Sequence, residues 1–98
     1  MNRAEVIDRL MHLEPELRSQ GVAALYLYGY YARDEAGPNS DIDILVDLEA
    51  DTDLVASMAP YALLECEFPG VEIGYGTRDI IVPSYSHHIE SGAFRVFS

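Results

Sequence analysis

The sequence contains no lysine, and its six arginines stand against 17 acidic residues, which gives a formal net charge of -11. A surface with this charge repels the phosphate backbone of nucleic acids, so direct binding of free DNA or RNA is not expected. The charge favours a basic protein partner, or a small anion that arrives together with Mg²⁺.

Long apolar runs are also missing. The longest, such as Val22 to Leu27, are far shorter than the roughly 20 residues of a membrane-spanning helix. The first residues, Met-Asn-Arg-Ala-Glu, lack the apolar core of a signal peptide. We therefore expect a cytoplasmic protein with no membrane partner.

Cysteine is represented once, by Cys66, which excludes an internal disulfide. It has no Cys or His at the close spacing of a zinc site, so we expect a small buried apolar residue. His87 and His88 are adjacent on a predicted helix and point in different directions. They are expected at the surface, without a metal.

The length of 98 residues suits one domain, residues 1–98, with one core. Apolar spacing predicts a helix over residues 3–13. Pro15 suits a first helical turn, so residues 14–20 are expected to form a separate short helix or a kinked continuation that ends at Gly21. An apolar strand is predicted over 23–28, followed by a short helix and a loop up to Ser40.

A second strand is predicted over residues 41–48, and a helix capped by Asp51 or Thr52 should run to about Glu65, bent or divided by Pro60. Two short strands, 71–75 and 79–82, could form a hairpin or one strand interrupted between Gly74 and Arg78. A last helix over 85–92 and an apolar tail over 94–97 complete the prediction. The residues expected in the core of the helix before Glu65 are Leu54, Val55, Met58, Ala62 and Leu63.

Two carboxylates open the second strand. Ile42, Ile44 and Val46 alternate with acidic residues, and strand alternation places Asp41 and Asp43 on the same face, only a few Å apart. Two anions at that distance repel each other unless a cation intervenes. Mg²⁺ prefers carboxylate and phosphate oxygens, so the pair plus a triphosphate forms a suitable ligand set.

A glycine bend lies just before this strand in the chain. Gly29 follows the first strand, and without a Cβ it allows the backbone to approach an anion closely. The N–H groups of the following turn and the positive end of the short helix would face phosphates. Arg33 is available to neutralise phosphate charge, or to pair at the surface with Asp34 or Glu35.

Residues 22–48 resemble the minimal nucleotidyltransferases of the DNA polymerase β superfamily, whose signature is Gly-Ser, ten residues, then Asp-x-Asp. Here Gly29 and Tyr30 are followed by ten residues, 31–40, and then by Asp41-Ile42-Asp43. Weaker similarity extends over most of the chain. The resemblance implies an α/β (α+β) domain with a small mixed β-sheet flanked by helices, the DNA polymerase β-like nucleotidyltransferase fold.

The family's reaction transfers a nucleoside monophosphate from a nucleoside triphosphate to a hydroxyl, here AMP from ATP, with two Mg²⁺ ions. The resemblance makes Asp41 and Asp43 metal ligands and catalytic residues. The third carboxylate falls on Glu72, because Val71-Glu72-Ile73 is similar to the family's Val-Asp-Leu strand, or on Asp79. The residues that the resemblance assigns to nucleotide binding are Gly29, Tyr30, Arg33 and Ser40.

The partners that the resemblance implies are a nucleoside triphosphate and a small HEPN-domain ribonuclease, for which short members of this family act as antitoxins. A homo-oligomer is compatible with the sequence. Two departures from the family favour a second hypothesis, a catalytically degenerate binding module that neutralises its partner by complex formation. The family's serine is Tyr30 here, and the second glycine of its turn is Asp34.

Overall fold

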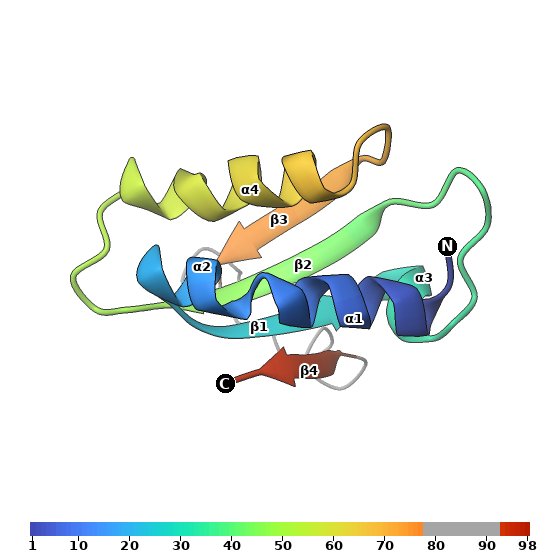
Figure 1. The fold of residues 1–98 in the computed structure, drawn as a ribbon, viewed down its shortest axis with the longest axis horizontal. Coiled ribbons are helices and arrows are strands. Elements are labelled where there is room, and N and C mark those ends of the chain that lie inside the picture. Colours follow the sequence, from blue (N-terminus) through green and yellow to red (C-terminus); the bar gives the residue numbers. More distant parts are fainter. Residues whose placement is uncertain (78–92) are drawn as a thin grey trace, which may run out of the picture.

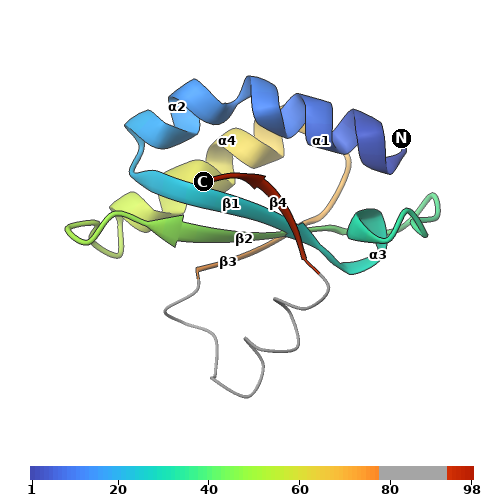
Figure 2. The same cartoon turned by 90° about the horizontal axis from the view of Figure 1, so that it is seen from below.

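Helices pack on one side of a four-stranded mixed sheet in the computed structural model, which describes residues 1–77 and 93–98 (Figures 1 and 2). The elements in chain order are α1 (Arg3–His12), α2 (Glu14–Ser19), β1 (Val22–Tyr28), α3 (Gly29–Ala32), β2 (Ile42–Leu48), the 3₁₀ turn η1 (Ala56–Met58), α4 (Ala59–Glu67), β3 (Ile73–Thr77) and β4 (Phe94–Phe97). The predicted α+β architecture with a mixed sheet is confirmed.

The strand order is β3-β2-β1-β4 (Figure 1). β1 pairs antiparallel with both β2 and β4, whereas β2 and β3 run parallel. The parallel pair needs a crossover connection, and α4 supplies it on the same side of the sheet as α1 and α2 (Figure 2). The other side of the sheet is therefore left uncovered by these three helices.

The core lies between the helices and the sheet. Helix α1 begins at Asn2, whose side chain accepts a hydrogen bond from the Glu5 N–H, and it buries Val6 and Leu10 completely. Alternate residues of β2 pack against this helical layer, as predicted. They are Ile42, Ile44 and Val46, all fully buried. The intervening acidic residues are thereby directed to the opposite side of the sheet.

The helix expected from Asp51 or Thr52 begins later than predicted. The side chain that accepts a hydrogen bond at this point is Asp53, from the N–H of Ala56 at 2.7 Å, and α4 itself starts at Ala59 with Pro60 in its first turn. Three residues expected in the core are consequently exposed: Leu54 by 76%, Val55 by 84% and Met58 by 51%. They precede α4, so they do not share its inward face.

The inward face of α4 is formed by Pro60 and Leu64, which are four residues apart and buried, and the buried Phe68 follows at the C-cap. Ala62 is exposed and Leu63 is only partly buried. Cys66 is exposed, so its predicted burial is wrong. It lies two positions after Leu64, which is about 200° around an α-helix and therefore away from the core.

β3 runs without interruption through Gly74, so the predicted break at this residue is wrong. The predicted tail is confirmed and forms β4, which buries Val96 and Phe97 against the core. The predictions that lie outside the described residues are the strand 79–82, the helix 85–92, Asp79, His87 and His88. Among the described helices, none has the length and apolar character needed to span a membrane.

Candidate active site

The glycine bend and the second aspartate meet where β1 ends. Antiparallel pairing of β1 with β2 places Tyr28 directly opposite Asp43. Gly29 then turns the chain into α3 with φ of +75°, a conformation that L side chains rarely adopt. The bend and the aspartate are therefore neighbours, as the sequence predicts.

Asp43 lies in a slot between two glycines. A Cβ on Gly29 would collide with its Oδ2 atom, and a Cβ on Gly74 would lie 2.5 Å from its Oδ1 atom. Gly74 belongs to β3 and is the direct neighbour of Asp43 in the parallel register. One carboxylate thus occupies the space that side chains at both glycine positions would need.

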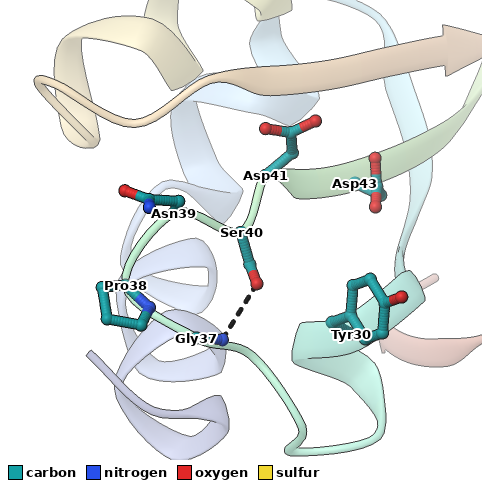
Figure 3. Close-up of a pocket in the computed structure, with 7 residues that line it drawn as sticks. All are labelled: Tyr30, Gly37, Pro38, Asn39, Ser40, Asp41 and Asp43. Carbon is teal, nitrogen blue, oxygen red and sulfur yellow. Dashed lines mark hydrogen bonds between the residues drawn. The ribbon is translucent and has the colours of Figure 1, made fainter.

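Asp41 and Asp43 line one cavity of about 460 Å³ (Figure 3). The opposite wall is the turn 37–40, which Ser40 closes by accepting a hydrogen bond from the Gly37 N–H at 2.9 Å. Tyr30 completes the lining, and its side chain remains 55% exposed. The structure therefore brings together four predicted site residues: Tyr30, Ser40 and both aspartates, with Gly29 directly beneath Asp43.

Burial and charge both act on Asp43. Partial burial raises the pKa of its carboxyl group, and the negative charge of Asp41 raises that pKa further. The pKa of the neighbouring Tyr28 phenol is also raised, first by burial and then by the charge of Asp43. The site therefore holds two negative charges in a partly buried environment. A divalent cation bound between them would offset their repulsion.

Arg33 does not line this cavity. Its guanidinium pairs with Glu35, with Nε 3.2 Å from Oε2, and lies over the Tyr30 ring at 5.1 Å from the centroid. This is the surface pairing that the sequence left open as an alternative to phosphate contact. In residues 1–77 and 93–98, no basic side chain lines the cavity.

Asp34, at the position of the family's second glycine, has φ of +58°. A non-glycine residue is strained in this left-handed region, although Asp tolerates it better than most. Its Oδ1 atom accepts a hydrogen bond from the backbone N–H of Arg3 at 3.2 Å, which ties the turn to the start of α1. The carboxylate is thus directed to a helix terminus and not into the cavity.

Glu72 is adjacent to the aspartate pair through the backbone. The Ile42 N–H donates to the Glu72 carbonyl at 3.0 Å, and Ile42 pairs with Ile73, so the register leads to Asp41 opposite Glu72. Both acids line a second cavity of about 240 Å³. Within the described part of the chain, no three Asp, Glu, His or Cys side chains gather closely enough to hold a metal ion, so Glu72 as third ligand stays a prediction.

Sequence reasoning missed Gly74. The available signal was a glycine inside a predicted strand, which often marks a close approach of other atoms. We interpreted it as a possible break in the strand. The residue that explains this glycine is its neighbour across the sheet, Asp43. Asp43 is 31 positions earlier in the chain, and only the β2–β3 pairing brings the two together.

A glycine bend and a carboxylate pair are thus held against each other by adjacent segments of the fold, at the spacing of the nucleotidyltransferase signature. Residues 10–93 match the family model described as a nucleotidyltransferase domain. The chain belongs to this nucleotidyltransferase family. No curated protein matches the chain.

Solved structures share the fold. A protein solved as a candidate minimal nucleotidyltransferase superposes with a TM-score of 0.83 at 22% identity, covering 96% of this chain and 95% of its own. A toxin–antitoxin structure with AMP-PNP gives 0.71 at 21% identity, covering 100% of this chain and 74% of its own. The MntA–HpeT toxin–antitoxin mutant gives 0.70 at 19% identity with the same coverage.

Proposed function

We propose that this protein transfers AMP from ATP to a hydroxyl group, with Asp41 and Asp43 as its central catalytic residues. The observation that carries the proposal is that both carboxylates line one cavity while the second rests against the Gly29 bend. This arrangement supports a triphosphate lying between the turn 37–40 and the aspartates. The family membership supports the same reaction class.

The carboxylate pair fits Mg²⁺ by its chemistry. Asp41 and Asp43 supply hard oxygen ligands, and the pKa of Asp43 is raised first by burial and then by the negative charge of Asp41, which a bound cation would offset. Mg²⁺, as two ions in this family, would supply charge neutralisation and Lewis-acid activation of the phosphate. Since these two side chains alone do not complete a coordination shell, phosphate oxygens and water would provide the remaining ligands.

The other site residues have distinct roles in this proposal. The backbone N–H groups of the turn that begins at Gly29 would face the phosphates. Ser40 uses its oxygen to accept from the Gly37 N–H, and its O–H can donate to a phosphate oxygen. Glu72 would accept the proton of the attacking hydroxyl as third carboxylate, with Asp79 as the alternative. Tyr30 would contact the nucleotide from the cavity wall through its ring or its phenol.

We further propose a HEPN-domain toxin as the protein partner and antitoxin action as the biological role. Toxin–antitoxin structures share the fold, and the structure with AMP-PNP supports a nucleotide substrate. The net charge of -11 fits a basic protein surface better than a nucleic acid. Incubation of the chain with Mg²⁺, a HEPN-domain protein and ATP labelled in its α-phosphate should transfer label to the HEPN-domain protein.

A second function, a binding module without catalysis, is favoured by one specific observation. No basic side chain among the described residues lines the cavity, and Arg33 is engaged by Glu35. In this alternative the chain neutralises its partner by complex formation alone. Unlabelled partner in a stable complex would support the module over the enzyme.

Calorimetric titration with ATP and Mg²⁺ separates the two functions. The enzyme should bind ATP, and Asp41→Asn should abolish binding because it removes a metal ligand. Asp47→Asn is the control, since Asp47 lies on the strand that follows Asp41, the substitution changes the charge equally, and Asp47 does not line the cavity. Absence of ATP binding by the folded wild-type protein would overturn the proposed enzyme.

A further inference from the structure

The backbone conformation at position 74 does not require a glycine. Glycines with positive φ among the described residues are Gly21, Gly29 and Gly70, so Gly74 has a backbone that any L residue can adopt. Glycine inside a strand weakens it, because it is conformationally free and has no side chain to pack. A reason for glycine at this position must therefore come from the space around it.

That space is occupied by Asp43. A Cβ on Gly74 would lie 2.5 Å from Oδ1, whereas real Cβ contacts of this kind are essentially never below 3.0 Å. The next nearest atoms, Cγ of Asp43 at 3.5 Å and its Cα at 3.7 Å, are at ordinary contact distance. The conflict is thus confined to the carboxylate itself and does not involve the backbone of β2.

Strand β3 cannot easily move away to make room. Its backbone pairs with β2 from Ile73 to Thr77, and both of these end residues are buried. Between the two glycines of the strand, the Tyr75 hydroxyl donates to the Ser57 carbonyl at 2.7 Å. A methyl group at position 74 would consequently have to displace the Asp43 carboxylate.

On its other side the carboxylate is already close to Gly29. Its Oδ2 atom already occupies the place of a Cβ on Gly29. A side chain on Gly74 would force a rotation out of the slot, and the orientation of Asp43 toward the cavity would be lost. The two glycines therefore act together, Gly29 from the start of α3 and Gly74 from β3.

We propose that Gly74 is a positioning residue, which holds the Asp43 carboxylate in the geometry required for metal and nucleotide binding by leaving the β3 side of its slot empty. The steric part of this inference stands on the contacts alone. Its consequence for nucleotide binding rests on the proposed function.

The chain offers a matched control in Gly76. Gly76 lies two positions further along β3, on the same side of the sheet, and its Cβ would meet only Cδ1 of Leu45 at 3.9 Å. Gly74→Ala and Gly76→Ala thus make the same chemical change on one face of one strand. They differ in whether the added methyl group meets the carboxylate.

A double-mutant cycle on thermal unfolding tests the slot without nucleotide. Gly74→Ala should lower the unfolding midpoint, and the same change in the D43A background should leave the midpoint unchanged or raise it, because the conflicting carboxylate is gone. Gly76→Ala should behave alike in both backgrounds. An equal loss from Gly74→Ala in both, or failure of both variants to fold, would overturn the proposal, because the backbone would then be limiting.

Nucleotide titration tests the functional consequence. Gly74→Ala should weaken binding of ATP with Mg²⁺ roughly tenfold or more and raise the Mg²⁺ concentration for half-maximal binding. In turnover it should lower kcat, whereas Gly76→Ala should match the wild type. Equal ATP binding in the wild type and both variants would overturn the positioning role and leave the proposed function intact. A wild-type protein that does not bind ATP would overturn the proposed function, and the unfolding cycle would still decide the slot.

Discussion

The Asp43 carboxylate occupies the position that a side chain on Gly29 would need. Gly29 is therefore required twice, once for φ of +75° and once for the close approach of Asp43. The first requirement arises where the chain turns into α3, and the second arises from the pairing of β1 with β2, which aligns Tyr28 with Asp43. The bend proposed to receive phosphate and the carboxylate proposed to hold metal are thus in direct contact.

Gly29→Ala should cost more stability than Gly70→Ala. Both residues have positive φ, +75° and +80°, so both variants should lose about 1 kcal/mol to left-handed backbone strain. Only Gly29 would also meet a carboxylate, since no atom lies within 4 Å of a Cβ on Gly70. Urea unfolding of the two variants measures the difference. Equal losses would show that Asp43 moves aside without cost.

Substitutions of Asp34 should separate backbone strain from hydrogen bonding. Asp34→Ala keeps the φ of +58° and loses the bond to the Arg3 N–H, so a loss of about 1–2 kcal/mol is expected. Asp34→Gly loses the same bond and relieves the strain, so its unfolding free energy should stay within about 0.5 kcal/mol of the wild type. A glycine variant as unstable as the alanine variant would contradict this account.

Two leucines near α4 should respond differently to truncation. Leu64→Ala should destabilise the protein by about 2–5 kcal/mol, because Leu64 is fully buried in the core. Leu54→Ala should change stability by less than about 0.5 kcal/mol, because Leu54 is 76% exposed. Chemical denaturation checks both values. A large loss from Leu54→Ala would mean that this residue packs against the core after all.

Tyr75 should make the fold sensitive to alkaline pH. Burial raises the pKa of its phenol from 10.0 to about 12. Below pH 10 the phenol is protonated in both folded and unfolded chains, so its full contribution to the free energy of unfolding is present. Between pH 10 and 12 only the unfolded chain ionises, and the contribution is lost as pH rises through the folded pKa.

Tyr75→Phe isolates this effect. At neutral pH the variant should be about 1 kcal/mol less stable, since the Ser57 carbonyl loses its hydrogen-bond donor. The gap to the wild type should then narrow as pH rises from 10 to 12. Stability curves measured by urea unfolding across this range would contradict the assignment if they stayed parallel.

The helix that was predicted to begin at Asp51 or Thr52 shows a limit of prediction from local apolar spacing. Leu54, Val55 and Met58 have apolar spacing that fits a helix, and a helix from Asp51 would have buried them. The chain instead uses Asp53 to accept from Ala56 and begins α4 at Ala59. Apolar spacing alone does not say where a helix starts, and a shift of a few residues decides which side chains face the core.

The sequence by itself determined the bend, the strands beside it and the acidic pair. Gly29 and Asp43 are close in the chain, strand alternation has a period of two, and short connections make consecutive strands neighbours. Those rules act locally, so they can be read along the chain. The parallel pairing of β2 with β3 was decided by the tertiary structure.

That pairing placed Gly74 beside Asp43 and the Glu72 backbone beside Asp41. The tertiary structure also decided that Arg33 pairs with Glu35 at the surface and does not line the cavity. Tertiary packing decides which residues far apart in the chain come into contact, and which of two available partners a side chain chooses. The periodic pattern of a single helix or strand does not contain this information. The residue types needed for the chemistry could thus be predicted from the sequence. The space around each side chain was decided by the tertiary structure.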